Sequence, residues 1–118
     1  MAKILSIEDS AFERKVISKV LRDTKHELIL AKNGKEGLKK LEEEKPDLLL
    51  LDLRLPDIDG IDILKEIKSK DLNVVIVSII REEKTKEETM KLGAKKYISK
   101  PITKDKLLPT IDEVLGDL

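Results

Sequence analysis

Five short apolar runs alternate with amphipathic segments along the whole chain. The runs are residues 4–7, 28–31, 48–51, 74–77 and 97–98. The third and fourth runs are apolar without alternation, which is typical of strands that are covered on both faces. Between the runs lie amphipathic stretches of roughly 10 to 14 residues, the crossover length that parallel strands need. The pattern predicts one α/β domain, a doubly wound parallel sheet with helices on both faces.

Three of the intervening helices have recognisable beginnings. Ser10 followed three residues later by Glu13 is a capping-box pattern, so the first helix is expected to begin directly after Ser10. The second helix is expected to begin near Asn33, and the third at Asp59 and Gly60.

The last two helices carry a weaker pattern. The fourth, over about 83–92, has only Met90 and Leu92 as sizeable apolar residues, so we expect it to be the least firmly packed. Thr103 can cap the fifth helix, but Pro109 removes a backbone donor inside it. A kink or a late start is therefore predicted there.

The composition narrows the classes of function. A chain of 118 residues has the length of one domain, and we assign residues 1–118 to it. Basic and acidic residues each number 24, so no net charge draws the protein to nucleic acid or to an acidic membrane surface. With no cysteine and one histidine, any metal site must be built from oxygen ligands. No signal-peptide pattern and no apolar stretch near ~20 residues occurs, so we expect a cytoplasmic protein.

Polar side chains follow four of the five predicted strands. They are Glu8 and Asp9 after the first, Asp52 after the third, Ser78 after the fourth and Lys100 after the fifth. Carboxyl ends of parallel strands meet at one edge of a sheet, where ligands bind. Crowded carboxylates favour a hard cation such as Mg2+. The lysine and the hydroxyl would hold phosphoryl oxygens, which leaves the third-strand aspartate as a candidate acyl-phosphate nucleophile.

The same residues resemble the receiver domains of two-component response regulators, such as the single-domain chemotaxis and sporulation regulators. The resemblance covers essentially the whole chain. Its motifs are Glu8-Asp9, four leucines before Asp52, Pro56, Asp59-Gly60, Ser78, Gly93-Ala94, Tyr97 and Lys100-Pro101. It implies the flavodoxin-like strand order 2-1-3-4-5 and a stand-alone phosphorylation switch.

The resemblance also implies where the phosphoryl group and the metal bind. Asp52 would accept the phosphoryl group. Mg2+ would be bound by Glu8, Asp9, Asp52 and the backbone carbonyl of Arg54. A glutamate replaces the more usual aspartate at the first acidic position, so we expect its metal contact to be less direct.

The remaining implied roles concern the phosphoryl oxygens and the output. Lys100 and Ser78 would bind phosphoryl oxygens, and Ser78 and Tyr97 would form the switch. The donor would be a histidine kinase or a histidine phosphotransfer domain, and the output a contact with a downstream protein. We expect a monomer and leave dimerisation on activation open, as well as the isomer of the Lys100-Pro101 bond.

Two isolated residues carry weaker predictions. We expect Phe12 to be partly exposed beside the site, where a kinase would dock. His26 precedes the second strand with no evident partner and is predicted to be an ordinary surface histidine.

Three other functions are weighed against the switch. A haloacid-dehalogenase-like phosphatase also uses a strand-end aspartate, but it has a second aspartate two positions on, where this chain has Arg54. A flavodoxin-like FMN protein needs a Ser/Thr-rich phosphate loop after the first strand, where Glu8 and Asp9 would repel phosphate. A receiver fold used as a phosphorylation-independent interaction module is disfavoured, because no acidic or phosphate-binding position is lost.

Overall fold

The computed structural model of the protein describes residues 1–67 and 71–116. At its centre lies a sheet of five parallel strands in the order β2-β1-β3-β4-β5. The strands are β1 (Lys3–Ile7), β2 (Glu27–Ala31), β3 (Leu48–Leu51), β4 (Asn73–Ser78) and β5 (Lys96–Ser99). The predicted fold class and strand order are confirmed, and each predicted apolar run lies inside the strand that it marks.

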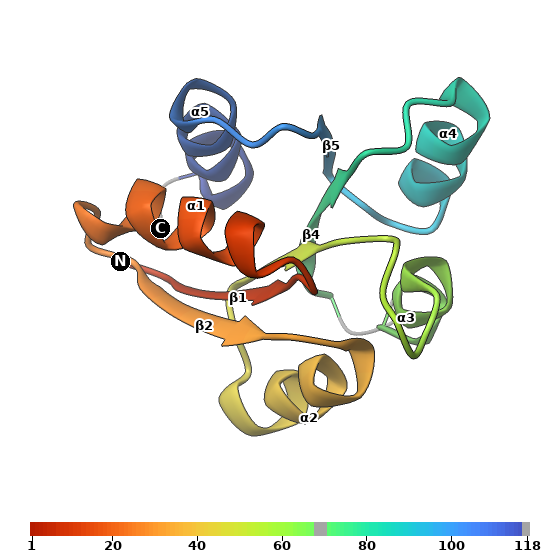
Figure 1. Cartoon of the computed structure of the whole chain (residues 1–118), viewed down its shortest axis with the longest axis horizontal. Helices are drawn as coiled ribbons and strands as arrows, with labels where there is room; N and C mark the ends of the chain where they lie inside the picture. Colours follow the sequence, from red (N-terminus) through yellow and green to blue (C-terminus); the bar gives the residue numbers. More distant parts are fainter. Residues whose placement is uncertain (68–70, 117–118) are drawn as a thin grey trace.

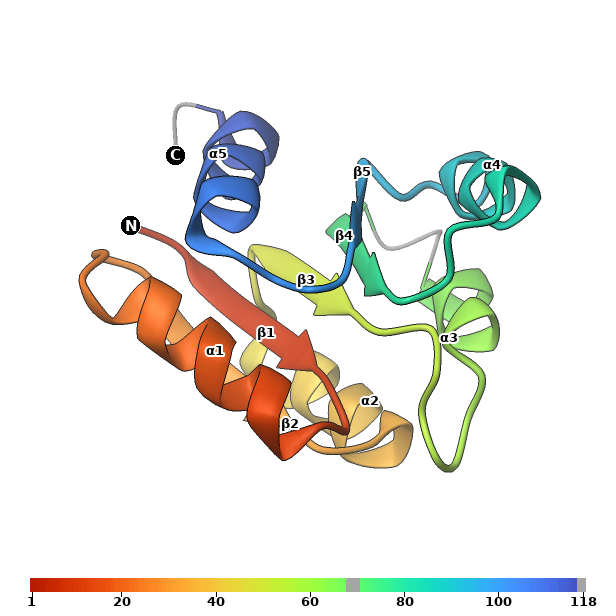
Figure 2. The same cartoon turned by 45° about the horizontal axis from the view of Figure 1, so that its top comes forward.

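Helices cover both faces of the sheet. They are α1 (Ala11–Arg22), α2 (Gly34–Glu44), α3 (Gly60–Ile67), α4 (Glu83–Lys91) and α5 (Lys104–Leu115). One apolar cluster packs α1 and α5 against one face, and a second packs α2, α3 and the residues that directly follow α4 against the opposite face (Figures 1 and 2). The leucines of β3 alternate between the two clusters and are all buried. The central strand therefore belongs to both halves of the core.

The first helix begins where the capping pattern predicts. The Ser10 hydroxyl accepts the backbone N–H of Glu13 at 3.2 Å. The reciprocal bond of a capping box is not formed, because the Ser10 N–H donates instead to Glu8 Oε2 at 3.1 Å. The N-terminus of α1 is thus tied to an acidic residue of the candidate site.

The fifth helix begins directly after its cap, so the predicted late start is wrong. Thr103 Oγ1 accepts the N–H of Lys106 at 3.3 Å, and α5 runs without a break through Pro109. Leu107 and Ile111, on either side of the proline, are fully buried and keep this face of the helix on the sheet.

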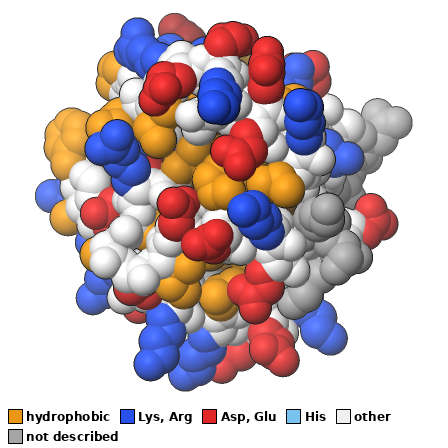
Figure 3. All heavy atoms as spheres, turned by 90° about the vertical axis from the view of Figure 1, so that its right-hand side faces the viewer, with side chains coloured by type: hydrophobic (Ala, Val, Ile, Leu, Met, Phe, Trp, Pro, Cys, Tyr) orange, Lys and Arg blue, Asp and Glu red, His pale blue; other side chains and the backbone are white. Residues whose placement is uncertain are grey.

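The fourth helix has even fewer apolar anchors than the sequence indicates. Met90, one of the two sizeable apolar residues of the predicted helix, is 45% exposed, so the expectation that it anchors the helix is wrong. The buried residue of α4 is its neighbour Thr89, whose hydroxyl donates to the carbonyl oxygen of Lys86 at 2.8 Å. Leu92 is half-buried just after the helix. On the side that Figure 3 shows, charged side chains of both signs surround a central apolar area.

The exposure predicted for Phe12 is confirmed, and the prediction made for His26 is wrong. Phe12 is 71% exposed, which confirms its predicted exposure. His26 is half-buried, and its Nδ1 accepts the backbone N–H of Ala2 at 3.0 Å, so it is not an ordinary surface histidine. Among the helices of residues 1–67 and 71–116, none combines the length and the apolar character needed to cross a membrane.

Candidate functional site

Backbone hydrogen bonds align the ends of the strands on which the predicted site residues lie. Ile7 pairs with Leu51 in the sheet register, and the Asp52 N–H donates to the Ile7 carbonyl at 3.1 Å. On the other side, the Lys100 N–H donates to the Ser78 carbonyl at 2.8 Å. The ladder thus continues past the strands and brings the residues that follow them to one edge of the sheet.

Three carboxylates gather at this edge. Glu8 and Asp52 are only 1% and 4% exposed, whereas Asp9 is exposed. One oxygen from each carboxylate lies within 4.8 Å of the others. Such proximity of negative charges in a buried place is unfavourable unless a cation compensates it.

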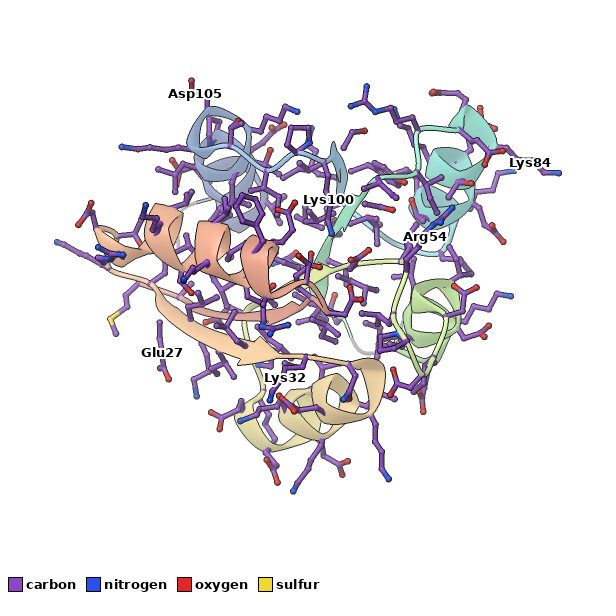
Figure 4. The ribbon with its side chains drawn as sticks, viewed as in Figure 1. Glu27, Lys32, Arg54, Lys84, Lys100 and Asp105 are labelled. Carbon is purple, nitrogen blue, oxygen red and sulfur yellow. The ribbon has the colours of Figure 1, made fainter. Side chains whose placement is uncertain are left out.

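Lys100 supplies this positive charge. Its Nζ lies 2.9 Å from Glu8 Oε1 and 2.9 Å from Asp52 Oδ2. Burial alone would lower the pKa of Lys100, but the hydrogen bonds and charges of the two carboxylates outweigh burial and raise it. The ammonium group therefore stays charged, and Figure 4 shows it pointing into the edge of the sheet. The Lys100-Pro101 peptide bond, whose isomer the sequence left open, is cis.

Glu8 carries the largest electrostatic perturbation at this edge. Burial raises its pKa from 4.5 to about 7, and the charge of Asp52 adds to the effect. Hydrogen bonds from Lys100 and from the Ser10 N–H oppose it but do not overcome it. Near neutral pH, Glu8 is therefore divided between its protonated and its charged forms.

Ser78 and Tyr97 are joined through one residue of the β4–α4 loop. The fully buried Ser78 Oγ accepts the N–H of Ile80 at 3.1 Å. The hydroxyl of Tyr97 donates to the carbonyl oxygen of the same Ile80 at 2.7 Å. Burial raises the pKa of Tyr97, so the phenol keeps the proton that it donates. The two predicted switch residues are thus linked by hydrogen bonds.

Arg54 lies two residues past Asp52, in the loop that leads to α3. Its backbone N–H donates to Asp52 Oδ1 at 3.0 Å, which fixes one oxygen of the predicted acceptor. Its side chain is exposed and extends away from Lys100 in Figure 4. The predicted metal-binding role of its carbonyl remains a prediction.

Sequence reasoning missed two side chains that hold loops next to the site. Arg14 Nη1 donates to the carbonyl oxygens of Glu8 and Asp9, at 2.8 and 2.9 Å. Asp57 binds backbone N–H groups at the start of α2. Both contacts join segments without a shared periodic pattern, so only the nearness of these residues to the motifs could have marked them.

The donor set fits a small divalent cation. Glu8, Asp9 and Asp52 offer hard carboxylate oxygens close enough to share one ion, and Asp9 opens the group to solvent. Mg2+ prefers such ligands and keeps several waters. Asp52 is not an isolated carboxylate at the end of a strand, because one of its oxygens accepts a hydrogen bond from Lys100 and the other accepts one from a backbone N–H.

Comparison with known proteins agrees with this geometry. Residues 4–112 match the response regulator receiver domain. The chain is 34% identical to the chemotaxis protein CheY of Listeria monocytogenes over 116 residues, which cover 96% of this chain and 98% of that protein.

Solved structures share the fold over nearly the whole length. A CheY-like receiver domain protein from Methanospirillum hungatei superposes with a TM-score of 0.92 at 27% identity, covering 99% of this chain and 95% of that one. The Mn2+-bound form of the response regulator Rcp1 gives a TM-score of 0.83 at 27% identity, covering 100% and 97%. These matches decide against the phosphatase and flavin alternatives. The chain belongs to the response regulator receiver domain family.

Proposed function

We propose that Asp52 accepts a phosphoryl group from the phosphohistidine of a histidine kinase or a histidine phosphotransfer domain. A carboxylate oxygen of Asp52 forms a bond to phosphorus, the phosphorus–nitrogen bond breaks, and its electron pair stays on the partner's imidazole. The observation that carries this proposal is the buried Asp52 carboxylate at the end of β3, bonded to Lys100 beside two further carboxylates.

We propose Mg2+ as the cofactor, bound by Glu8, Asp9, Asp52 and the Arg54 carbonyl. When bound, the ion would offset the negative charge of the carboxylates and of the incoming phosphoryl group. The fit of the three carboxylates supports this assignment, as does the divalent cation in the Rcp1 structure. Asp9 is the exposed member of the group, so it is the carboxylate that is open to an entering ion.

Lys100 and Ser78 would bind the phosphoryl oxygens. The Lys100 ammonium already lies 2.9 Å from Asp52 Oδ2 and can follow the charge onto the phosphoryl group. These groups orient the acceptor and the phosphoryl group, so the domain would assist its own phosphorylation and dephosphorylation.

The structural change caused by phosphorylation would be transmitted from Ser78 to Tyr97 by the backbone of Ile80. When Ser78 turns to a phosphoryl oxygen, its bond from the Ile80 N–H is strained or lost, and the β4–α4 loop shifts. Tyr97 holds the other end of Ile80, so it moves with the loop. We propose that the surface of α4, β5 and α5 changes in this way and binds a downstream protein target. The protein would act in the cytoplasm as a monomer, with dimerisation on activation left open.

Phosphorylation with a small donor tests the proposal. The full chain is incubated with acetyl phosphate and Mg2+, and the phosphorylated residue is mapped by mass spectrometry. We expect one phosphate on Asp52, none in Asp52→Asn, and parent behaviour in Asp23→Asn, a matched change at the exposed end of α1. Equal labelling of Asp52→Asn and the parent would refute the acceptor. No labelling of the parent, by a small donor or by a kinase, would favour the interaction module.

A further inference from the structure

One side chain connects the β3–α3 loop to the start of α2. Asp57 Oδ1 accepts the N–H of Gly34 at 2.8 Å, and Asp57 Oδ2 accepts the N–H of Lys35 at 2.9 Å. The cap of α2 itself, Asn33, accepts the N–H of Glu36 at 2.8 Å. The free N–H groups of the first helical turn are thus divided between a local cap and a carboxylate from 22 or 23 residues away in the sequence.

Both sides of this contact fit each other closely. A methyl group on Gly34 would lie 3.0 Å from Ile58 Cβ and 3.2 Å from Asp57 Oδ1. The hydrogen bonds from Lys35 and Gly34 hold the pKa of Asp57 below its ordinary value. The carboxylate is therefore charged at neutral pH, where it also interacts favourably with the positive end of the α2 dipole.

The other end of the loop is held at the base of α3. The Gly60 N–H donates to the Leu53 carbonyl at 2.9 Å. A side chain at Gly60 would lie 2.5 Å from the carbonyl oxygen of Asp52, so the loop returns very close to the phosphoacceptor. The backbone from Asp52 to Gly60 is therefore fixed at its base by this contact and at its tip by Asp57.

Arg54 lies inside this doubly fixed loop. We propose that Asp57 is a positioning residue for the metal site, which anchors the loop tip on α2 and so holds the Arg54 backbone in place for the cation. This inference rests on the proposed function, because the Arg54 carbonyl is a proposed ligand. Without the anchor, the loop must be ordered when the ion binds, and that cost weakens the affinity.

Three variants of the full chain separate positioning from simple loss of stability. Asp57→Ala removes both bonds to α2. Asp57→Asn keeps the shape of the side chain but leaves only one atom that can accept a hydrogen bond. It replaces the alanine variant in the test if the alanine variant does not fold. Asn33→Ala is the matched control, since it removes a cap from the same helix and leaves the loop contact intact.

The readouts are a Mg2+ titration followed by NMR and amide hydrogen exchange without metal. We expect Asp57→Ala to bind Mg2+ about tenfold more weakly, with Asp57→Asn in between. We also expect faster metal-free exchange of the Arg54 amide in both variants. Asn33→Ala should keep the parent affinity even where its thermal midpoint falls.

The failures of the two proposals are distinguishable. If the parent binds Mg2+ and Asp57→Ala binds it equally well, the positioning role is wrong and the metal site stands. The role is also wrong if Asn33→Ala weakens binding as much as Asp57→Ala. If the parent amides at Asp9 and Asp52 do not respond to Mg2+, the proposed metal site falls, and this inference falls with it.

Discussion

Glu8 should give the metal-free protein an unusual dependence of stability on pH. Burial raises the pKa of its carboxyl group from 4.5 to about 7 in the folded chain. A carboxyl group with a raised pKa binds its proton more tightly in the folded state than in the unfolded state. The stabilising contribution of protonated Glu8 is therefore fully present below 4.5 and is lost as the pH rises through about 7.

The two pKa values fix the size of the effect. Between about pH 5.5 and about pH 8, linkage through Glu8 should lower the free energy of unfolding by about 2 kcal/mol. Lys100 adds no slope in this range, because its pKa is raised above 10.5 and it stays charged in both states. Asp57 has a lowered pKa, so its contribution is lost only as the pH falls below its ordinary value of 3.8.

Urea unfolding in EDTA at these two pH values measures the effect. Lowering the pH from the higher to the lower value should raise the free energy of unfolding of the parent by about 2 kcal/mol more than that of Glu8→Gln, in which the titrating group is gone. Glu27→Gln, a change at an exposed glutamate of β2, should keep the parent slope. Equal pH dependence in the parent and Glu8→Gln would refute the reasoning.

Four further changes have defined outcomes. Phe12→Ala should slow phosphotransfer from the cognate kinase about tenfold and leave phosphorylation by acetyl phosphate unchanged, because the exposed ring is expected to contact the docked kinase; equal slowing of both would contradict this. Gly60→Ala should lower the free energy of unfolding by about 2 kcal/mol, since its methyl group would meet the Asp52 backbone; urea unfolding measures it, and an unchanged midpoint would refute the clash. Ile79→Ala should speed acetyl phosphate labelling about threefold, because the exposed side chain directly after Ser78 is expected to crowd the approach to Asp52; a parent rate would exclude crowding. Phosphorylation should alter amide hydrogen exchange over residues 83–99, where α4 has little packing to resist a shift; change confined to α1 would contradict the proposed route.

The sequence predicts what depends on local pattern. The apolar runs mark all five strands, and the rule that ligands bind at the carboxyl ends of parallel strands places Glu8, Asp52 and Lys100 at one edge. Their contacts in the structure confirm that they meet there. Each of these predictions needs only neighbouring residues and one general rule of parallel sheets.

Other features depend on contacts that no local pattern contains. Thr89, not Met90, is buried in α4, because the rotation of a short polar helix is set by what it packs against. The Ser10 N–H donates its hydrogen bond to Glu8 and not to Glu13, since the carboxylate of the buried glutamate lies next to the first turn of α1. The contact of Asp57 with α2 joins two segments that only the folded sheet brings together. Such pairings become visible only when the whole topology is known.

The four leucines of β3 have a consequence for how reliably the chain folds. A strand with the same residue on both faces cannot set its own alignment, because a shift by one position exchanges like for like. The alignment of β3 must therefore be set by the charged residues at its two ends, Asp47 and Asp52. Sliding by one residue would carry Asp52 into the place of Leu51, or Asp47 into that of Leu48, and would bury a carboxylate without its partners. Asp52, the residue proposed to react, thus also disfavours a shifted alignment of the central strand during folding.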